Sequence, residues 1–508
     1  MARSARIVMT TPQDGWMNRH ENVTQKIQRL YEIYNPPAPV SNMLGDLQLT
    51  VAELRRIIGE ALQGGVSVRA FGGTWSLSRA AVTDGWLIDT RQLNWSFTLA
   101  PASIAPAYRG DPASLYFAQC GVGVQELNER LAARGRALAT SGASNGQTIA
   151  GAVATGTHGS AFGFGAMTEY VVGIQLIVSP ERTVWLERAS YPVVSDDFLA
   201  RLGAEPVRDD ALFNAALVSF GSFGLVHAMM LETVPLYLLE ASRRRMPADS
   251  ALRNAMNTLD FSGLQLPHPQ ETPWHFEVVF NPHDVTGGAY VTTMYKRPYR
   301  EDYPKPSTTS GGLGPGDSLL AVVGQLTNLL PGGVIATIAN GLIGSQYPTY
   351  GQQWGIPGEI FTSTTTHGKG MSMEFGVAHT DSSRVLDLLL AAKPEIDSFA
   401  GVMAFRYVKQ SGATLGFTRF PITCTVEFNA AHSDRTVAFY NRIWNDLEKE
   451  GIPYTLHWGQ MDNFTPARVR AMYGAAADQW CAARKALLSE RMCAVFSSTY
   501  LESCGLAG

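Results

Sequence analysis

The sequence predicts an α+β protein of two domains, in which an α+β domain comes first and a second domain has a mixed or antiparallel sheet covered by helices. The chain has 508 residues, more than one hydrophobic core normally supports. Strand and helix patterns alternate up to about residue 235, as expected of an α+β or α/β unit. After Pro235 short strands and long loops follow, with a Gly/Pro/Ser-rich stretch at 304–316. This change of pattern marks the predicted boundary.

The first domain is expected to begin with a helix and a strand that leads into a glycine turn. A Thr-x-x-Glu capping box at 50–53 precedes apolar residues at helical spacing, and Gly64-Gly65 ends the helix. A strand at 66–71 then runs into Gly72-Gly73, where the backbone must bend or approach a ligand closely. Further strands are expected at 86–89, 115–120, 170–178, 184–187 and 225–234, with helices at 124–134 and 209–220.

The second domain shows the pattern of a sheet covered by helices. Strand-like segments lie at 275–280, 371–378 and 423–428, and helices are expected at 382–392 and 433–450. Near the C-terminus, Thr465 as N-cap, Pro466 at the first helical position and Gly474 past the end predict another helix. A last helix is expected at 476–488. We therefore divide the chain into residues 1–235, 236–460 and 461–508.

Composition and charge exclude several classes of protein. The net charge is −4, from 40 basic and 44 acidic side chains, so the chain lacks a basic field for nucleic acid. The most apolar region, 319–343, is interrupted by polar residues, Pro and Gly, so we interpret it as buried helix and loop rather than a membrane span. No signal-peptide pattern is seen at the N-terminus. Five cysteines without a CxxC pair or a metal-like cluster predict reduced thiols, a cytoplasmic location and no metal.

Two segments rich in Gly, Ser and Thr carry the chemical signal. They are RAFGGTWS at 69–76 and GASNGQTIAGAVATGTHG at 142–159. Backbone N–H groups and hydroxyls that short side chains leave uncovered can bind a pyrophosphate. Neither segment reads GxGxxG with an acidic residue at ribose distance, which disfavours NAD, and neither has the Gly-Lys-Ser/Thr of a Walker A loop.

Both segments resemble the FAD-binding domain of the vanillyl-alcohol oxidase (PCMH-type) superfamily of FAD-linked oxidoreductases. The closer likeness is to its aldonolactone and alditol oxidase branch, whose second loop reads Ala-Gly-x-x-Ala-Thr-Gly-Thr-His-Gly-Ser, as residues 150–160 do here. Weaker matches at 219–226, 457–459 and 496–501 extend the likeness along the chain. The resemblance implies an FAD-binding domain (1–235) that is completed by the C-terminal segment (461–508), and a substrate domain (236–460) that closes over the flavin ring.

Two departures from the branch carry information. Trp75 stands where many members have the histidine that bonds covalently to the flavin, and the second loop has no cysteine, so we expect non-covalent FAD. Gln460 and Ala404 stand where the sugar-oxidising branch has a lysine and a glutamate, while Arg406 remains. Fewer charged partners for hydroxyls predict a pocket of low charge and a small non-sugar alcohol or amine as substrate.

The resemblance also implies site residues. The expected FAD contacts are Ala70, Phe71, Gly72, Gly73, Thr74, Trp75, Ser76, Gly142, Ala143, Thr148, Gly151, Thr155, Gly156, Thr157, His158 and Val226. By position, the substrate side of the flavin is lined by Arg406, Glu427, Asn429, His457 and Gln460. Alternation along the strand at 371–378 adds Glu374 as a candidate base.

The predicted function is an FAD-dependent oxidase that moves a hydride from substrate to flavin N5, with molecular oxygen as the second partner. In the resembling family a small residue just before the conserved run of the second loop controls the path of oxygen, and Gly142 stands there. The alternatives are a flavoenzyme that works as a dehydrogenase or without oxidation, and, more distantly, a serine hydrolase that uses the GxSxG at 142–146.

Overall fold

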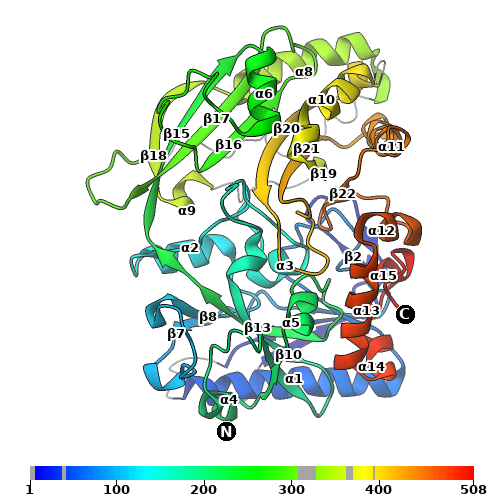
Figure 1. The fold of residues 1–508 in the computed structure, drawn as a ribbon. Helices are drawn as coiled ribbons and strands as arrows, with labels where there is room; N and C mark the ends of the chain where they lie inside the picture. The colour runs from blue at the N-terminus through cyan, green and yellow to red at the C-terminus, as the bar shows by residue number, and fades with distance from the viewer. Residues whose placement is uncertain (1–5, 37–41, 307–327, 362–369, 393–394) are drawn as a thin grey trace.

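The computed structural model describes residues 6–36, 42–306, 328–361, 370–392 and 395–508. It has two halves, which Figure 1 shows one above the other. The lower half contains most of the first 235 residues and the C-terminal helices. The upper half contains one large sheet with helices on both faces. The predicted α+β class is confirmed.

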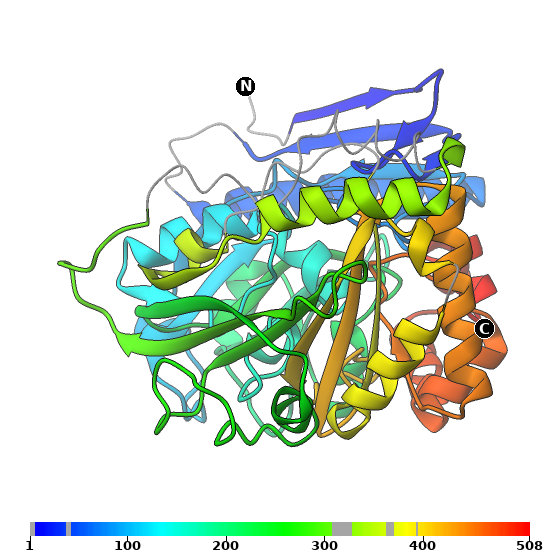
Figure 2. The same ribbon diagram turned by 90° about the horizontal axis from the view of Figure 1, so that it is seen from above.

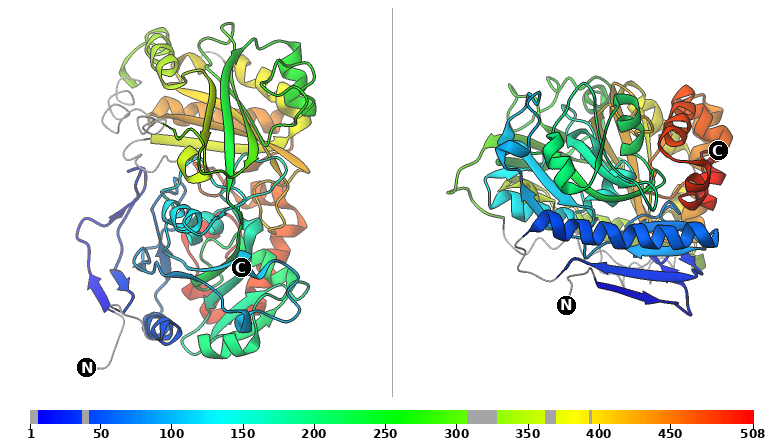
Figure 3. Two further views of the ribbon diagram at one scale, coloured as in Figure 1. Left: turned by 90° about the vertical axis from the view of Figure 1, so that its left-hand side faces the viewer. Right: turned by 90° about the horizontal axis from the view of Figure 1, so that it is seen from below.

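The lower half contains two sheets and a long helix, α1 (Met43–Gly64). Figure 3 shows the N-terminal strands and α1 along one side of this half. The first sheet has the order β1-β4-β6-β5, formed by β1 (Arg6–Thr10), β4 (Arg29–Tyr34), β5 (Val68–Phe71) and β6 (Trp86–Asp89). The second has the order β12-β11-β10-β13-β8-β7, formed by β7 (Ser96–Thr98), β8 (Leu115–Gln119), β10 (Val171–Ile177), β11 (Thr183–Glu187), β12 (Glu205–Arg208) and β13 (Leu225–Glu232).

Helix α1 begins earlier than the sequence predicts. Its N-cap is Asn42, whose side chain accepts a hydrogen bond from the backbone N–H of Gly45. Thr50, the predicted first residue, is buried inside the helix, and its hydroxyl donates to the carbonyl of Asp46 at 3.4 Å. A threonine can satisfy its hydroxyl in this way within a helix, so the capping-box pattern at 50–53 gave the wrong start.

The upper half is built on an eight-stranded antiparallel sheet. The strand order is β18-β15-β17-β16-β20-β21-β19-β22. Its strands are β15 (Tyr237–Met246), β16 (His275–Phe280), β17 (Ala289–Pro298), β18 (Tyr350–Gly355), β19 (Gly370–Ala378), β20 (Gly401–Lys409), β21 (Ile422–Ala431) and β22 (Thr455–Leu456). Helices α6 (Ser250–Thr258) and α10 (Ser382–Ala391) lie on one side of the sheet and α8 (Gly332–Gln346) on the other (Figure 2).

Helix α8 packs one face against the sheet and exposes the other. Ala339 and Ile343 are buried in a cluster with Val402 of β20. Leu329, just before the helix, is 79% exposed, and Val334 is 44% exposed. The expectation that 319–343 is buried is therefore wrong for the outer side of this region, because only one stripe of a helix can face a sheet. Residues 319–327, and most of the stretch 304–316, lie outside the described residues.

The C-terminal segment packs on the lower half, as Figure 1 shows for α12 (Pro466–Tyr473), α13 (Ala475–Leu487), α14 (Glu490–Val495) and α15 (Thr499–Ser503). The indole N–H of Trp480 donates to the carbonyl of Val218 at 2.9 Å. The buried guanidinium of Arg484 donates to Ser222 at 3.0 Å. These contacts support the proposed division at 235 and 460. Within the described residues, no helix is long and apolar enough to cross a membrane.

Candidate active site

A cavity of about 480 Å³ lies where the two halves meet, and the predicted site residues gather around it. Its wall includes all six predicted catalytic residues and every predicted FAD contact except Gly156. Gly156 serves the loop itself, because its φ of +72° belongs to the left-handed region that glycine adopts easily. The volume is in the range typical of ligand sites in proteins.

The two glycine-rich loops interlock at one end of the cavity. A β-carbon added to Gly72 would overlap the side chain of Thr148, and one added to Gly146 would overlap the indole ring of Trp75. The first loop thus occupies space that a glycine of the second loop leaves free. The second loop likewise occupies space that a glycine of the first loop leaves free. Helix α3 (Ile149–Ala154) starts directly after Thr148. Such a helix start and the bare loop backbone offer N–H groups to an anion.

The first loop holds Trp75 in a defined position. Thr74, a β-branched residue, has a φ of +57°, a conformation that is costly outside glycine and is found at functional sites. The guanidinium of Arg19 lies 4.8 Å from the centre of the Trp75 ring. The buried indole N–H of Trp75 and the amide oxygen of Gln147 have no hydrogen-bond partner among the described residues. These two groups and the glycine cradle fit a bound cofactor.

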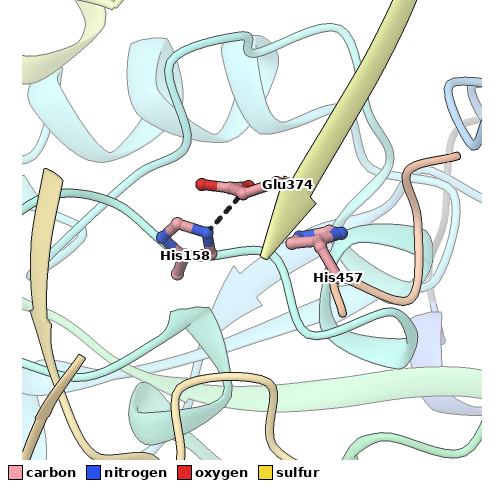
Figure 4. Close-up of side chains that lie close together, drawn as sticks. All are labelled: His158, Glu374 and His457. Atoms are coloured by element: carbon pink, nitrogen blue, oxygen red, sulfur yellow. Dashed lines mark hydrogen bonds and ion pairs between the residues drawn. The ribbon is translucent and has the colours of Figure 1, made fainter. Parts of the chain in front are cut away.

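The opposite side of the cavity carries a buried charged cluster. Arg406 of β20 donates to Glu374 of β19 at 2.9 Å and to Glu427 of β21 at 2.6 Å. The other oxygen of Glu374 lies 3.2 Å from Nε2 of His158, which belongs to the second glycine-rich loop. Figure 4 shows this contact, with His457 beside it. The cluster therefore joins the sheet of the upper half to the cofactor loop of the lower half.

The surroundings of the cluster push the two carboxyl groups apart in pKa. Burial raises the pKa of Glu427, although Arg406 acts against this shift. Burial alone would also raise the pKa of Glu374, but the charges of His158 and Arg406 outweigh it and lower the pKa. Burial lowers the pKa of His457 to about 4, so this ring is neutral at pH 7. An ionised carboxylate thus lies beside one that holds a proton more readily.

Three members of this cluster also have the residue types of a metal site. His158, Glu374 and His457 each offer a ligand atom, and these atoms lie within 4.8 Å of one another. However, Arg406 donates to Glu374, and its positive charge opposes a cation at the same carboxylate. We interpret the group as a hydrogen-bonded network. The cluster itself was not expected from the sequence, because its three residues lie far apart in the chain.

Sequence reasoning missed several residues of the cavity wall, among them Arg243, Glu277 and Tyr347. Their strand and helix neighbours match no motif, and β15 was not predicted at all. The arginines at 243, 244 and 245 mask its strand pattern. The expectation of a pocket of low charge is therefore wrong, because Arg243 and Glu277 line it together with the Arg406 cluster.

The hydrolase alternative does not fit the geometry. The GxSxG segment follows a strand of only two residues, β9 (Arg136–Ala137), whereas a nucleophile elbow needs a strand that leads directly into the serine. Ser144 is half-buried and makes no hydrogen bond to a histidine within the described part of the chain. Nδ1 of His457 accepts the backbone N–H of Gly459 at 3.0 Å instead.

Comparison with known proteins identifies the domain that carries both loops. Residues 49–187 match the family model of an FAD binding domain. The chain is 25% identical over 207 residues to D-arabinono-1,4-lactone oxidase of Yarrowia lipolytica, covering 40% of this chain and 34% of that protein. It is 27% identical over 256 residues to L-gulono-1,4-lactone dehydrogenase of Mycobacterium tuberculosis, covering 50% of this chain and 49% of that protein. The chain thus spans a third to a half of the length of these relatives.

Solved structures share the whole fold. A cholesterol oxidase from B. sterolicum has a TM-score of 0.67 at 11% identity, covering 98% of this chain and 97% of that chain. A chitooligosaccharide oxidase has a TM-score of 0.60 at 10% identity, covering 96% and 94%. At these identities the likeness concerns the fold alone.

Residues 49–187 are therefore an FAD binding domain, within a fold that known oxidases share. The predicted resemblance to the vanillyl-alcohol oxidase superfamily and to its aldonolactone oxidase branch is confirmed by the FAD binding domain, the lactone-oxidising relatives and the shared fold. FAD as the predicted cofactor is confirmed as well. Its non-covalent attachment stays a prediction.

Proposed function

We propose that this protein is an FAD-dependent oxidase that removes a hydride from an alcohol carbon and returns the electrons to molecular oxygen. The observation that carries the proposal is the Glu374–Arg406–Glu427 cluster, which lines the same cavity as the two glycine-rich loops. Bound FAD would supply the hydride acceptor at its N5 atom. The chain supplies the charges and the proton acceptor that this oxidation needs.

Arg406 provides a buried positive charge in the cavity. It is held by two carboxylates, and burial, which would lower its pKa, is outweighed by Glu427 and Glu374, which raise it. The guanidinium therefore stays charged at every pH at which the protein is folded. A fixed buried cation stabilises negative charge that develops beside it during the reaction. We assign this electrostatic role to Arg406.

Glu427 is the proposed acceptor of the hydroxyl proton of the substrate. Its oxygens contact Arg406, the hydroxyl of Ser372 at 3.2 Å and the amide of Gln460 at 3.3 Å. Its raised pKa is what a general base near neutral pH requires. Glu374, the candidate base predicted from the strand pattern, is engaged by both His158 and Arg406. We therefore assign Glu374 to orienting these two residues.

Two substrate classes have support from the cavity. The charged wall, with Arg243 and Glu277 beyond Arg406, favours a hydroxylated alcohol or lactone, in line with the names of the lactone-oxidising relatives. The apolar part of the wall, with Ile343 and Val402, supports the small non-sugar alcohol or amine predicted from the sequence. We favour the hydroxylated substrate, because buried charges without a polar ligand are costly.

One experiment separates the two half-reactions, with two variants that serve as controls for each other. Arg406→Met should slow anaerobic flavin reduction by at least about 10-fold, since a buried charge contributes a few kcal/mol, and leave reoxidation by oxygen unchanged. Gly142→Val should slow reoxidation by oxygen and leave anaerobic flavin reduction unchanged. Gly142 lines the cavity, and a β-carbon there would lie 3.1 Å from Thr157. Unchanged reduction in Arg406→Met would refute the role of Arg406, and reduced enzyme that persists in air would indicate a dehydrogenase.

A further inference from the structure

A row of polar side chains crosses the sheet of the upper half. In the strand register Arg243 of β15 faces Thr292 of β17, Thr292 faces Glu277 of β16, and Glu277 faces Arg406 of β20. Residues that face each other on neighbouring strands project to the same side of a sheet. Arg243, Glu277 and Arg406 all line the cavity. The row therefore runs along the wall of the cavity, from the Arg406 cluster to β15.

Arg243 differs from Arg406 in having no carboxylate partner. Its Nε donates to the hydroxyl of Thr292 at 3.0 Å, and its guanidinium lies over the rings of Tyr347 and Tyr350, 5.3 and 5.4 Å from their centres. Among the described residues no carboxylate oxygen lies within 4.0 Å of it. Only 6% of its surface is exposed. A charge buried in this way calls for a polar ligand.

Glu277 is the matching acceptor. It lines the cavity and lies between Arg243 and Arg406 in the row of polar side chains. It makes no hydrogen bond or ion pair to any described residue. In the strand order, Arg243 lies two strands from Glu277 and three strands from Arg406. Because neighbouring strands are about 4.8 Å apart, the backbones of Arg243 and Arg406 are about 14 Å apart. Long side chains such as arginine and glutamate can therefore meet on one ligand group. The Arg406 cluster is left for the reacting end of the substrate.

We infer that Arg243 and Glu277 form a recognition site for neighbouring hydroxyl groups at the end of the substrate away from the reacting carbon. This inference rests on the proposed function and deepens it. A hydroxyl both accepts and donates hydrogen bonds, so a pair of hydroxyls satisfies the donor Arg243 and the acceptor Glu277 together. A carboxylate on the substrate would be repelled by the negative charge of Glu277, and an ammonium group would be repelled by the positive charge of Arg243. The two residues thus replace the lysine and glutamate that the sequence lacks at Gln460 and Ala404.

Four six-carbon primary alcohols test the inference, because they share the reacting CH2OH group and differ in the groups on the other carbons. They are sorbitol, 1-hexanol, 6-hydroxyhexanoate and 6-amino-1-hexanol. Anaerobic rapid mixing with the flavin-loaded enzyme gives the dissociation constant and the limiting reduction rate for each. Sorbitol should bind more tightly than the other three. In Arg243→Gln and in Glu277→Gln its dissociation constant should rise about 10- to 100-fold, while that of 1-hexanol and the limiting rates stay unchanged.

Arg244→Gln is the matched control, since Arg244 is the next residue of β15 and is exposed. It should leave every constant unchanged. Unchanged sorbitol binding in both test variants, with full flavin content, would overturn the inference while the oxidase proposal stands. Tighter binding of the carboxylate or the ammonium probe would also overturn it. If no alcohol reduces the flavin, the oxidase proposal fails. The shift of the flavin absorbance on sorbitol binding then decides the inference, which stands only if both variants weaken that shift.

Discussion

Single residues decide how the cofactor is held. By the resemblance described above, Trp75 stands where many members have their covalent anchor. Its ring packs against Gly146 and near Arg19. A second ring, His20, lies 5.7 Å from it, centre to centre, and also lines the cavity. Sequence reasoning missed His20, because it belongs to no motif. Trp75 cannot bond to a flavin carbon, so the account predicts that contacts alone hold FAD.

We expect acid or heat precipitation of the purified protein to release all of its flavin. The measurement is the flavin absorbance of the supernatant against that of the pellet. Flavin that stays on the pellet would contradict non-covalent attachment. In that event His20→Ala would show whether His20 is the anchor, because His20 is the imidazole beside Trp75 in the cavity wall.

At the scale of elements, the predicted FAD site depends on two loops that share space. The glycines of one loop make room for the side chains of the other: Gly72 for Thr148, and Gly146 for Trp75. This reciprocal fit explains why both loops are rich in glycine. It also explains why the motif could be read from the sequence, whereas the packing between the loops could not.

Gly146→Ala should impair FAD binding, because its β-carbon would overlap the ring of Trp75. We expect at least about a 10-fold weaker affinity for FAD, the cost of displacing one well-packed aromatic ring. Titration of the apoprotein with FAD measures it. Gly163→Ala, at a position where a β-carbon meets nothing within 4 Å, is the matched control. Equal affinities in the two variants would refute the interlocking of the loops.

The sequence predicted the elements that have a regular pattern. The strand bounds at 86–89 and 275–280 agree with β6 and β16, and the helix after Thr465 agrees with α12. The strands β15 and β17 were missed because charged and polar residues along them hide the alternation. Strand β20 was missed because it is buried along nearly its whole length and therefore shows no alternation. The same strands carry Arg243 and Thr292, and β20 aligns Arg406 with Glu277. The charged wall of the cavity therefore became visible only in the folded chain.

At the scale of the whole molecule, buried neutral histidines couple stability to pH. Burial lowers the pKa of His227, His275 and His457 to about 4 each. Nδ1 of His227 lies 2.8 Å from the amide oxygen of Gln175, and Nε2 lies 3.2 Å from the amide nitrogen of Gln119. The oxygen of that Gln119 amide accepts from Trp95, which fixes its orientation. A second proton on the ring would thus face a donor.

Stability should fall as the pH drops from about 6.5 to about 4. In this window the unfolded chain binds protons on these histidines and the folded chain does not, so unfolding is favoured at the lower pH. A shift of this size is worth about 3 kcal/mol for each histidine at the acid end. Thermal or urea unfolding at a series of pH values measures the slope. Asp462, whose pKa burial raises to about 7, opposes part of this slope, because there the folded chain holds the proton. His227→Gln should reduce the slope, and an unchanged slope would contradict the assignment of His227.

The central claim is that this chain uses bound FAD to oxidise a hydroxylated alcohol or lactone. The most direct test is the flavin spectrum of the purified protein after anaerobic addition of sorbitol or L-gulono-1,4-lactone. We predict that the visible absorbance of the oxidised flavin is lost on mixing, as the flavin takes up the hydride, and returns when air is admitted. A flavin that stays oxidised with hydroxylated and non-sugar alcohols alike would contradict the claim.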